Sequence, residues 1–365
     1  MKGTDRAKGW VLAAGCGVAA AALLFCSASV GEGIRRGLAV SATVMIPSLF
    51  PFLILSDFVG RTRVGRMLEG LLGGAAEKIY RCPRQLAPAL LMSWIGGYPA
   101  GARVLAGMAE RGVLDREDAE AALAFCVNSG PAFLVTVVGV GVFGSPGWGL
   151  FLFGCQLAAG AVAGRLLCRR GIRARAEGRL SPLPAAAGLV QAVASGTGGM
   201  LSICAFVLVF SAVAQVLEDG GLLALFGGWL SGITGGLLTP QGAACFGTGL
   251  LEIGGGCARA QQLPPGQGAL VLPFLLSFSS CSVICQLGAC FGERPAKLRQ
   301  LLRARVVHGL LTTALATPVL WGRFASAPAM TGQPVLAPGS GGLLGALCMA
   351  AMCGILASAI GEGEG

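Results

Sequence analysis

Charged residues are scarce in this sequence: they make up 12% of its 365 residues, about half the share in a soluble domain. Histidine occurs only once, as His308, and there is no CxxC pair, HExxH zinc motif, GxSxG elbow or P-loop. The fourteen cysteines lie mostly inside apolar runs, where cysteine acts as a small buried hydrophobe. We therefore expect no metal, no cofactor and no enzyme activity.

Apolar residues take the place of the missing charges. Hydrophobic residues make up 54% of the chain, and the mean hydropathy is +0.74. Apolar runs of about 18–24 residues recur from end to end, which is the length that crosses a bilayer as a helix. We predict an all-α polytopic membrane protein with about eight full crossings, held in the lipid bilayer of a bacterial cell membrane.

The net charge of +10 is distributed over loops and not over one face of the chain. Basic residues cluster in the segments 61–84, 165–179 and 294–305, between apolar runs. This is the positive-inside pattern of cytoplasmic loops, so we expect cytoplasmic N and C termini and no nucleic-acid partner. The first apolar run, Trp10–Phe25, fits a cleaved signal peptide or a retained helix. We favour the retained helix because many helices follow it.

The apolar run Ala119–Val142 is interrupted at its centre by Asn128, Ser129, Gly130 and Pro131. Pro131 has no N–H and disfavours helical geometry at Gly130, where glycine lets the backbone leave the helix. We expect two half-helices with an unwound joint near mid-membrane, an arrangement that many transporters use to build a substrate site. An ordinary proline kink is the simpler alternative.

The apolar run before it, Leu86–Ala109, is broken by Gly96–Gly101. Each half is too short to span a bilayer. We predict a re-entrant helical hairpin that enters and leaves on one side, with Gly97, Pro99 and Gly101 at its hinge.

Five elements of the first half recur in the second half in the same order. Three of the five cross the membrane in each half, so the second repeat is expected to be inverted, again with a hairpin and a broken helix. The predicted parts are an N-terminal helix and loop (1–37), a first repeat (38–168), a basic cytoplasmic linker (169–189), a second repeat (190–322) and an outer loop with a last helix, Leu343–Ile360 (323–365).

The polar breaks and hairpin tips of the two repeats are expected to meet at the midplane. Half-helix amino termini present free N–H groups and a positive dipole end, which suits an anion. The candidate substrate-binding residues are Tyr98, Arg103, Asn128, Ser129, Ser279, Ser280 and Ser282. The candidate helix-break or hinge residues are Gly97, Pro99, Gly101, Gly130, Pro131, Gly254 and Gly255.

Glu252 is the candidate for a coupling ion or a proton, because an intramembrane carboxylate is costly and is functional by default. It also fits a neutral acid that is hydrogen-bonded at a helix break. Arg103 likewise fits a snorkelling arginine at the exit of the hairpin. The weaker candidates are Asp57, Gln156, Gln215, Gln286 and His308, and a glutamine on a packed helix more often joins helices than binds a ligand.

Five segments carry a resemblance to a known family: PSLFPFLI (Pro47–Ile54), GYPAGAR (Gly97–Arg103), FCVNSGPAF (Phe125–Phe133), GLLEIGGG (Gly249–Gly256) and SFSSCSV (Ser277–Val283). They resemble the sporulation integral membrane protein YlbJ (SpoVV) family, of the nucleoside-recognition Gate domain group. That group includes concentrative nucleoside transporters and the gate regions of the ferrous-iron transporter FeoB. The resemblance covers residues 38–320, with three departures. Family members usually have Lys at Arg103 and Asn at Gly130, and their second break reads more like FSGLSV.

The resemblance implies export of dipicolinic acid, a small planar dicarboxylate, from the mother cell across the outer forespore membrane during sporulation. Two alternatives stay open: a nucleoside or other small-solute secondary transporter, and a non-transporting membrane sensor or scaffold. The sequence leaves open whether the chain forms a homo-oligomer.

Overall fold

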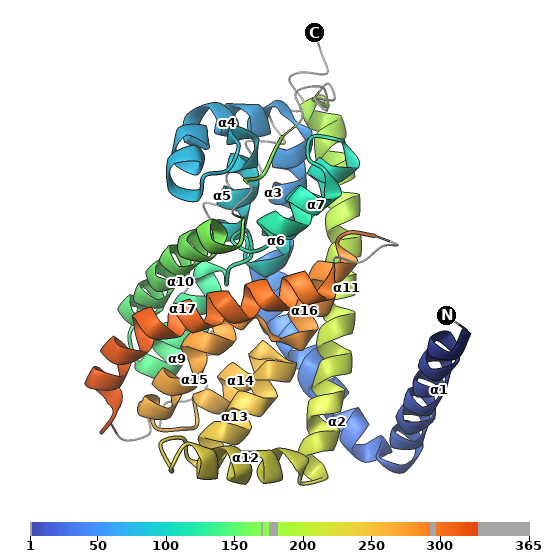
Figure 1. Ribbon diagram of the computed structural model, residues 1–365, viewed down its shortest axis with the longest axis vertical. Helices are drawn as coiled ribbons and strands as arrows, with labels where there is room; N and C mark the ends of the chain where they lie inside the picture. The colour runs from blue at the N-terminus through green and yellow to red at the C-terminus, as the bar shows by residue number, and fades with distance from the viewer. Residues whose placement is uncertain (1, 169–170, 175–181, 293–296, 328–365) are drawn as a thin grey trace.

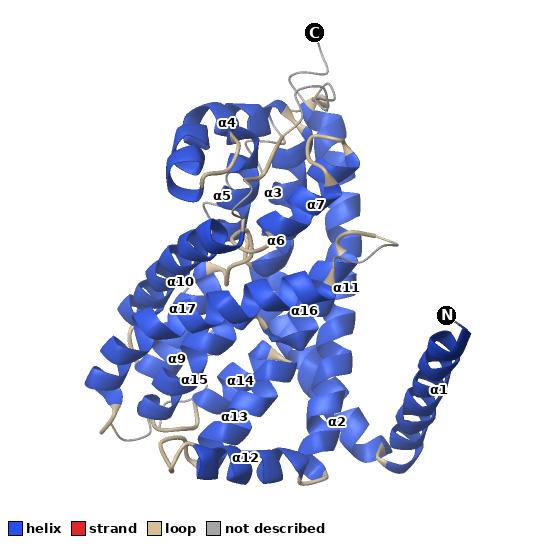
Figure 2. Cartoon of the chain, in the orientation of Figure 1, coloured by secondary structure: helices blue, strands red, loops and turns tan. Residues whose placement is uncertain are grey.

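Helices make up nearly all of the described chain (Figure 2). The computed structural model describes residues 2–168, 171–174, 182–292 and 297–327. In these ranges the only β pairing is an isolated bridge between Leu114 and Ala174. The all-helical prediction is therefore confirmed for the part of the chain that the structure describes. The predicted last helix, Leu343–Ile360, lies outside the described residues.

Two long helical stretches run side by side and form a scaffold (Figure 1). The first consists of α2 (Ser27–Val40), a π-helical turn (Ser41–Met45) and α3 (Ile46–Arg61), and the second is α11 (Ala185–Asp219). Each stretch has 35 residues, about 52 Å at the helical rise. The first stretch stays helical past Pro47, because this proline lies at the start of α3 and the wide turn before it accommodates the missing N–H.

The first half of the chain adds a short-helix cluster to this scaffold. In chain order the elements are α4 (Arg63–Ala75), a π turn (Ala76–Tyr80), a 3-10 turn (Arg84–Leu86), α5 (Ala87–Ile95), α6 (Tyr98–Glu110), α7 (Arg116–Ala122), α8 (Pro131–Phe133), a π turn (Leu134–Val140), α9 (Gly141–Phe143) and α10 (Pro146–Leu167). Helices α5 and α6 pack against each other as a hairpin that bends at Gly96 and Gly97.

The second half begins with α11. It continues with α12 (Leu222–Ile233), α13 (Pro240–Leu251), α14 (Ile253–Ala260), α15 (Pro265–Phe278), α16 (Ser280–Ala289) and α17 (Leu298–Phe324). Helices α13 and α14 form a second hairpin, which bends at Glu252. Helix α17 packs along both α15 and α10, so it joins the two halves.

Four helical stretches are long and apolar enough to cross a membrane: Ser27–Arg61, Pro146–Leu167, Ala185–Asp219 and Pro265–Ala289. Apolar side chains on the outside of α11, among them Leu201 and Val209, are exposed, as lipid contact requires. The stretch Pro265–Ala289 is mostly buried inside the molecule and contains the second helix break. Helix α1 (Lys2–Phe25) stands apart from the main body (Figure 1) and exposes Trp10 and Phe25.

Candidate functional site

The chain unwinds between α7 and α8. Helix α7 ends at Ala122, and regular helix resumes only at Pro131. Gly130 is extended (φ −66°, ψ 144°) and caps the new helix, and Pro131 suits its first turn because an N–H there has no helical partner. Asn128 and Ser129 lie in the unwound segment and are buried. The segment is thus a true gap in the helix and not a proline kink.

The second break is a sharp bend and not a gap. Helix α15 ends at Phe278 and α16 begins at Ser280, with left-handed backbone at Ser279 (φ 85°) and Ser280 (φ 72°). Two consecutive non-glycine residues with positive φ store backbone strain, which is typical of functional sites. Ser280 Oγ accepts a hydrogen bond from the N–H of Val283, and Ser282 Oγ accepts one from Gln286.

The two breaks are joined through Tyr98, at the tip of the first hairpin. The Tyr98 hydroxyl donates to the carbonyl of Leu276 at 2.6 Å, two residues before the end of α15. It also lies in hydrogen-bond contact with Ser129 Oγ of the first break, which itself donates to the same carbonyl at 3.1 Å. One hairpin tip and both breaks therefore meet at a single buried point.

Gln156 of α10 reinforces this meeting point. Its Oε1 accepts from the backbone N–H of Ser129 at 3.0 Å, and its Nε2 donates to the Leu276 carbonyl at 2.9 Å and to Ser277 Oγ at 3.2 Å. The amide thus bonds to both breaks at once. Gln156 was a weaker candidate for the site, with helix joining as the alternative, and the contacts in this structure join helices.

A polar layer continues from the breaks into α17. Ser277 Oγ donates to Thr312 Oγ1 at 2.7 Å, and His308 Nε2 lies 2.9 Å from the Gln156 carbonyl. Asn128 Nδ2 donates to Ser93 Oγ of the first hairpin at 3.2 Å. Asn128 Oδ1 and His308 Nδ1 have no hydrogen-bond partner among the described residues. This polar core therefore has spare hydrogen-bonding capacity.

Arg305 completes the layer and was missed at the sequence level, where it was counted among the basic residues of the loop segment 294–305. It is fully buried, on the second turn of α17. Its guanidinium donates to four backbone carbonyls, those of Leu123, Ala124, Val127 and Ser277. No carboxylate among the described residues pairs with it. The loop-charge interpretation of Arg305 is therefore wrong, because packing of α17 buries that side of the helix.

Glu252 sits at the bend of the second hairpin. Its carboxylate accepts from the N–H groups of Gly254 (2.9 Å) and Gly255 (2.6 Å) and so caps α14. A cavity of about 40 Å³ is lined by Glu252, Tyr98 and Gly130, together with Gly97, Pro99, Gln286 and apolar side chains from α3 and α11. The volume is close to that of one water molecule. In this conformation the cavity is closed to any organic solute.

The hairpin glycines make these close approaches feasible. A Cβ at Gly101 would collide with the Cys126 carbonyl and with Ser93, so Gly101 lets the first hairpin touch the first break. Gly97 adopts a left-handed backbone (φ 79°) with its backbone against Gly130. The other predicted hinge residues lie at the same bends: Pro99 on the first turn of α6, and Gly254 and Gly255 on that of α14.

Arg103 is the predicted site residue that the structure places away from this cluster. Its Nη2 lies 2.9 Å from Asp57 Oδ2 of α3, and it also donates to the hydroxyl (2.5 Å) and carbonyl (2.9 Å) of Ser195 on α11. It lines a different, polar cavity together with Asp57, Glu110 and Arg111. Arg103 is neither at the breaks nor snorkelling freely, since its charge is paired with the scaffold.

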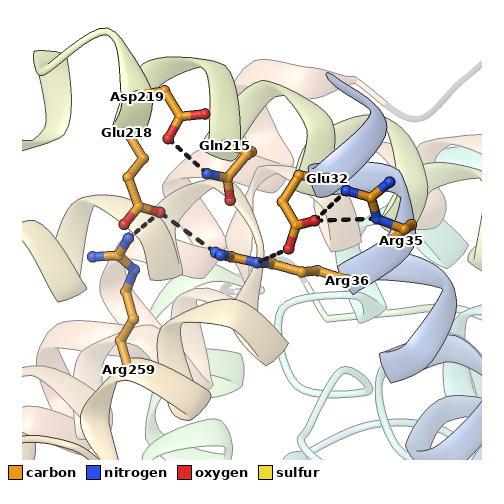
Figure 3. A network of polar contacts seen from close by, with 7 residues as sticks. All are labelled: Glu32, Arg35, Arg36, Gln215, Glu218, Asp219 and Arg259. Carbon is orange, nitrogen blue, oxygen red and sulfur yellow. Dashed lines mark hydrogen bonds and ion pairs between the residues drawn. The ribbon is translucent and has the colours of Figure 1, made fainter. Parts of the chain in front are cut away.

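The second hairpin has a similar connection to the scaffold. Figure 3 shows Arg259 of α14 ion-paired with Glu218 near the end of α11. Glu218 also lies 3.9 Å from Arg36 of α2, which is bound to Glu32. Each hairpin therefore carries, on its second helix, an arginine that is paired with an acid of the scaffold.

A wide basic hollow opens beside α17. It has a volume of about 630 Å³ and is lined by Lys297, Arg299, Arg303 and Glu120 among others. Lys297 pairs with the exposed Glu117 at 2.8 Å and lowers the pKa of that carboxyl by hydrogen bonding and charge attraction. No carboxylate among the described residues pairs with Arg299 or Arg303. The hollow is therefore large and positive enough to admit a small anion.

The chain is 25% identical over 319 residues to the sporulation integral membrane protein YlbJ of Bacillus subtilis (strain 168), a match that covers 80% of this chain and 77% of YlbJ. It is a homologue of YlbJ. With the four candidate spans, this homology shows an integral membrane protein. No protein-family model and no solved structure matches the chain, so the relation of this YlbJ homologue to the Gate domain group stays a prediction.

Proposed function

We propose that the protein carries a small organic anion across a membrane, with dipicolinate as its first candidate substrate. The observation that carries the proposal is Arg305, a buried cation between two broken helices with no carboxylate partner among the described residues. A buried charge without a counter-ion is costly. A solute that brings negative charge to the breaks is stabilised by Arg305 and by the spare polar groups around it.

The arrangement of the elements supports a carrier of inverted repeats. A surface helix, a hairpin, a broken helix and a long closing helix follow α3 in that order, and the same order follows α11. In Figure 1, α4 lies near one end of the molecule and its counterpart α12 at the opposite end. We propose repeats at 38–168 and 190–322, joined by the linker 169–189 and flanked by 1–37 and 323–365. Such repeats place the solute site at the breaks near the midplane.

Homology to YlbJ supports a role in sporulation, because YlbJ is described as a sporulation integral membrane protein. We therefore propose transport from the mother cell toward the forespore, in the outer forespore membrane, with both termini cytoplasmic. The basic hollow beside α17 would collect the anion on the cytoplasmic side. The cavity of about 40 Å³ at the breaks must enlarge before the solute enters. Movement of the hairpins against the scaffold supplies that enlargement.

A second candidate function follows from Glu252. Its carboxylate borders the cavity at the breaks, and a fixed negative charge there disfavours a dianion. Tyr98 and Gln286, which border the same cavity, offer hydroxyl and amide contacts that fit a neutral solute such as a nucleoside. The second candidate is therefore a nucleoside carrier with the same architecture.

Uptake by liposomes that contain the purified protein separates the two. Labelled dipicolinate and labelled uridine are tested with wild type, Ser129→Ala and the matched control Ser202→Ala, whose serine is exposed on the outside of α11. We expect dipicolinate uptake in wild type and the control, and a loss of several-fold in Ser129→Ala. Uridine uptake alone would favour the nucleoside carrier. Equal dipicolinate uptake by all three proteins would show that the substrate does not bind at the breaks.

A further inference from the structure

Arg305 binds a set of carbonyl groups that belongs to the helix breaks. Nη1 donates to Val127 O at 2.8 Å and to Ser277 O at 3.3 Å, and Nη2 donates to Leu123 O at 3.0 Å and to Ala124 O at 2.9 Å. Three of these carbonyls follow the end of α7, and Ser277 lies one residue before the end of α15. The guanidinium thus sits where two interrupted helices direct their negative dipole ends.

Carbonyls of this kind are cation ligands. A helix that stops inside a membrane leaves its last carbonyls without helical partners, and they must be satisfied internally. In carriers with broken helices, unwound carbonyls and the carboxyl ends of half-helices coordinate the coupling Na⁺. The four oxygens around Arg305 form such a set, and a side chain of the protein occupies it.

We propose that Arg305 is a built-in cation that replaces a coupling Na⁺ or K⁺ at the breaks. The guanidinium is always charged and keeps several donors in a fixed plane, so it can satisfy four carbonyls at once. Its charge repels a second cation from the same oxygens. The carrier therefore works without binding a monovalent cation there, as a facilitator or an anion exchanger. The transport consequence rests on the proposed function, whereas the cation site does not.

The surroundings of Arg305 agree with this role. On the same face of α17, three and seven residues further along, lie His308 and Thr312, which bond to Gln156 and to Ser277 and carry no negative charge in these contacts. Arg303, two residues earlier, is exposed and lines the basic hollow. Arg303 is thus a matched control: it has the same side chain on the same helix but no carbonyl set.

Thermal unfolding of the detergent-purified protein tests the cation site without a substrate. Wild type, Arg305→Ala, Arg305→Lys and Arg303→Ala are compared in Na⁺, K⁺ and choline chloride at one ionic strength. For wild type, Arg305→Lys and Arg303→Ala, we expect that the Tm of each protein does not change from one salt to another. We expect a lower Tm for Arg305→Ala, which Na⁺ or K⁺ raises by a few degrees over choline, because a small ion then enters the vacated carbonyls.

Two results would overturn the proposal. One is a Na⁺-specific rise in the Tm of wild type, and the other is a folded Arg305→Ala protein that responds equally to all three salts. If Arg305→Ala does not fold, dipicolinate uptake by wild type decides. Equal uptake in Na⁺ and in choline supports the built-in cation, and uptake that requires Na⁺ refutes it. Absence of uptake in every salt would count against the carrier function alone, since the Tm of wild type in the three salts still tests the site.

Discussion

Arg103 and Asp57 form an ion pair, with 2.9 Å between Nη2 and Oδ2, that joins the second helix of the first hairpin to α3. Both side chains are largely buried, and Ser195 of α11 adds two further acceptors for the same nitrogen. The hairpin is thereby fixed to both scaffold helices. Arg259 and Glu218 fix the second hairpin to α11 in the same manner. If a hairpin moves away from the scaffold to open the closed cavity, the ion pair that joins this hairpin to the scaffold must break.

Removing either partner of the first pair should destabilise the protein more than removing both. Arg103→Gln leaves a buried carboxylate, and Asp57→Asn leaves a buried guanidinium, each at a cost on the order of 3 kcal/mol. The double variant leaves neither charge, so its Tm should lie above those of the two single variants. Thermal unfolding in one detergent measures all four proteins, with Arg66→Gln on the exposed face of α4 as a control.

Uptake by the same variants tests whether Arg103 fixes the hairpin to the scaffold or binds the solute directly. If Arg103 held the solute directly, Asp57→Asn would keep or increase dipicolinate uptake while Arg103→Gln abolished it. We expect instead that both single variants change uptake in the same direction, because each loosens the same hairpin. Opposite effects of Arg103→Gln and Asp57→Asn on uptake would indicate that Arg103 binds the substrate.

Tyr98→Phe should weaken the junction of the two breaks. The change removes a hydroxyl that contacts Ser129 and donates to Leu276, and keeps the ring. Hydrogen bonds between membrane helices are worth about 0.6–1.7 kcal/mol, so the Tm should fall by a few degrees. The only other tyrosine, Tyr80, packs its buried ring 5.4 Å from that of Phe125 and provides the control Tyr80→Phe. A control that loses as much stability as Tyr98→Phe would argue against a special role for this hydroxyl.

At the second break we expect a glycine substitution to be more stable than an alanine substitution, which is the reverse of their usual order in a helix. At a normal helical position glycine is less stable than alanine by about 1 kcal/mol. Ser280 has a φ of 72°, which glycine adopts freely and alanine does not. Ser280→Gly should therefore unfold at a higher temperature than Ser280→Ala. The usual order, with alanine more stable, would mean that the backbone at Ser280 is not left-handed in the membrane.

Sequence reasoning located both breaks and both hairpin bends, because each consists of residues that a membrane helix avoids. Gly96, Gly97 and Pro131 cannot continue a helix without cost, and Asn128 and Glu252 are polar at positions where lipid-facing residues are apolar. These signals are local in the sequence. They also identified Tyr98 and Ser129, whose side chains lie beside the bends and meet in the structure.

The partners of the arginines were not predictable in the same way. Arg103 finds Asp57 46 residues earlier in the chain, and only the packing of α6 against α3 brings them together. Arg305 was grouped with the loop arginines, although the spacing of polar residues along α17 indicates that it is buried. Arg305, His308 and Thr312 recur at helical spacing along one face of α17, whereas Arg299 and Arg303 lie on another. A polar stripe in an apolar helix indicates a buried polar layer.

Glu252→Gln should distinguish the two candidate substrates. The carboxylate accepts from two backbone N–H groups at the start of α14, whereas the amide has one oxygen to offer and places its N–H₂ against the other donor. Loss of such a cap costs about 1 kcal/mol, so the variant should fold with a Tm lowered by a few degrees. Its loss of negative charge beside the cavity should lower the KM for dipicolinate and leave the KM for a neutral nucleoside unchanged.

The control for Glu252→Gln is Glu252→Asp, which keeps the charge but shortens the reach to Gly255. It should lose stability without gaining affinity for the anion. Initial rates of uptake at several concentrations of dipicolinate and of uridine give the six KM values for wild type and the two variants. A KM for dipicolinate that rises in Glu252→Gln would show that the carboxyl helps to hold the solute.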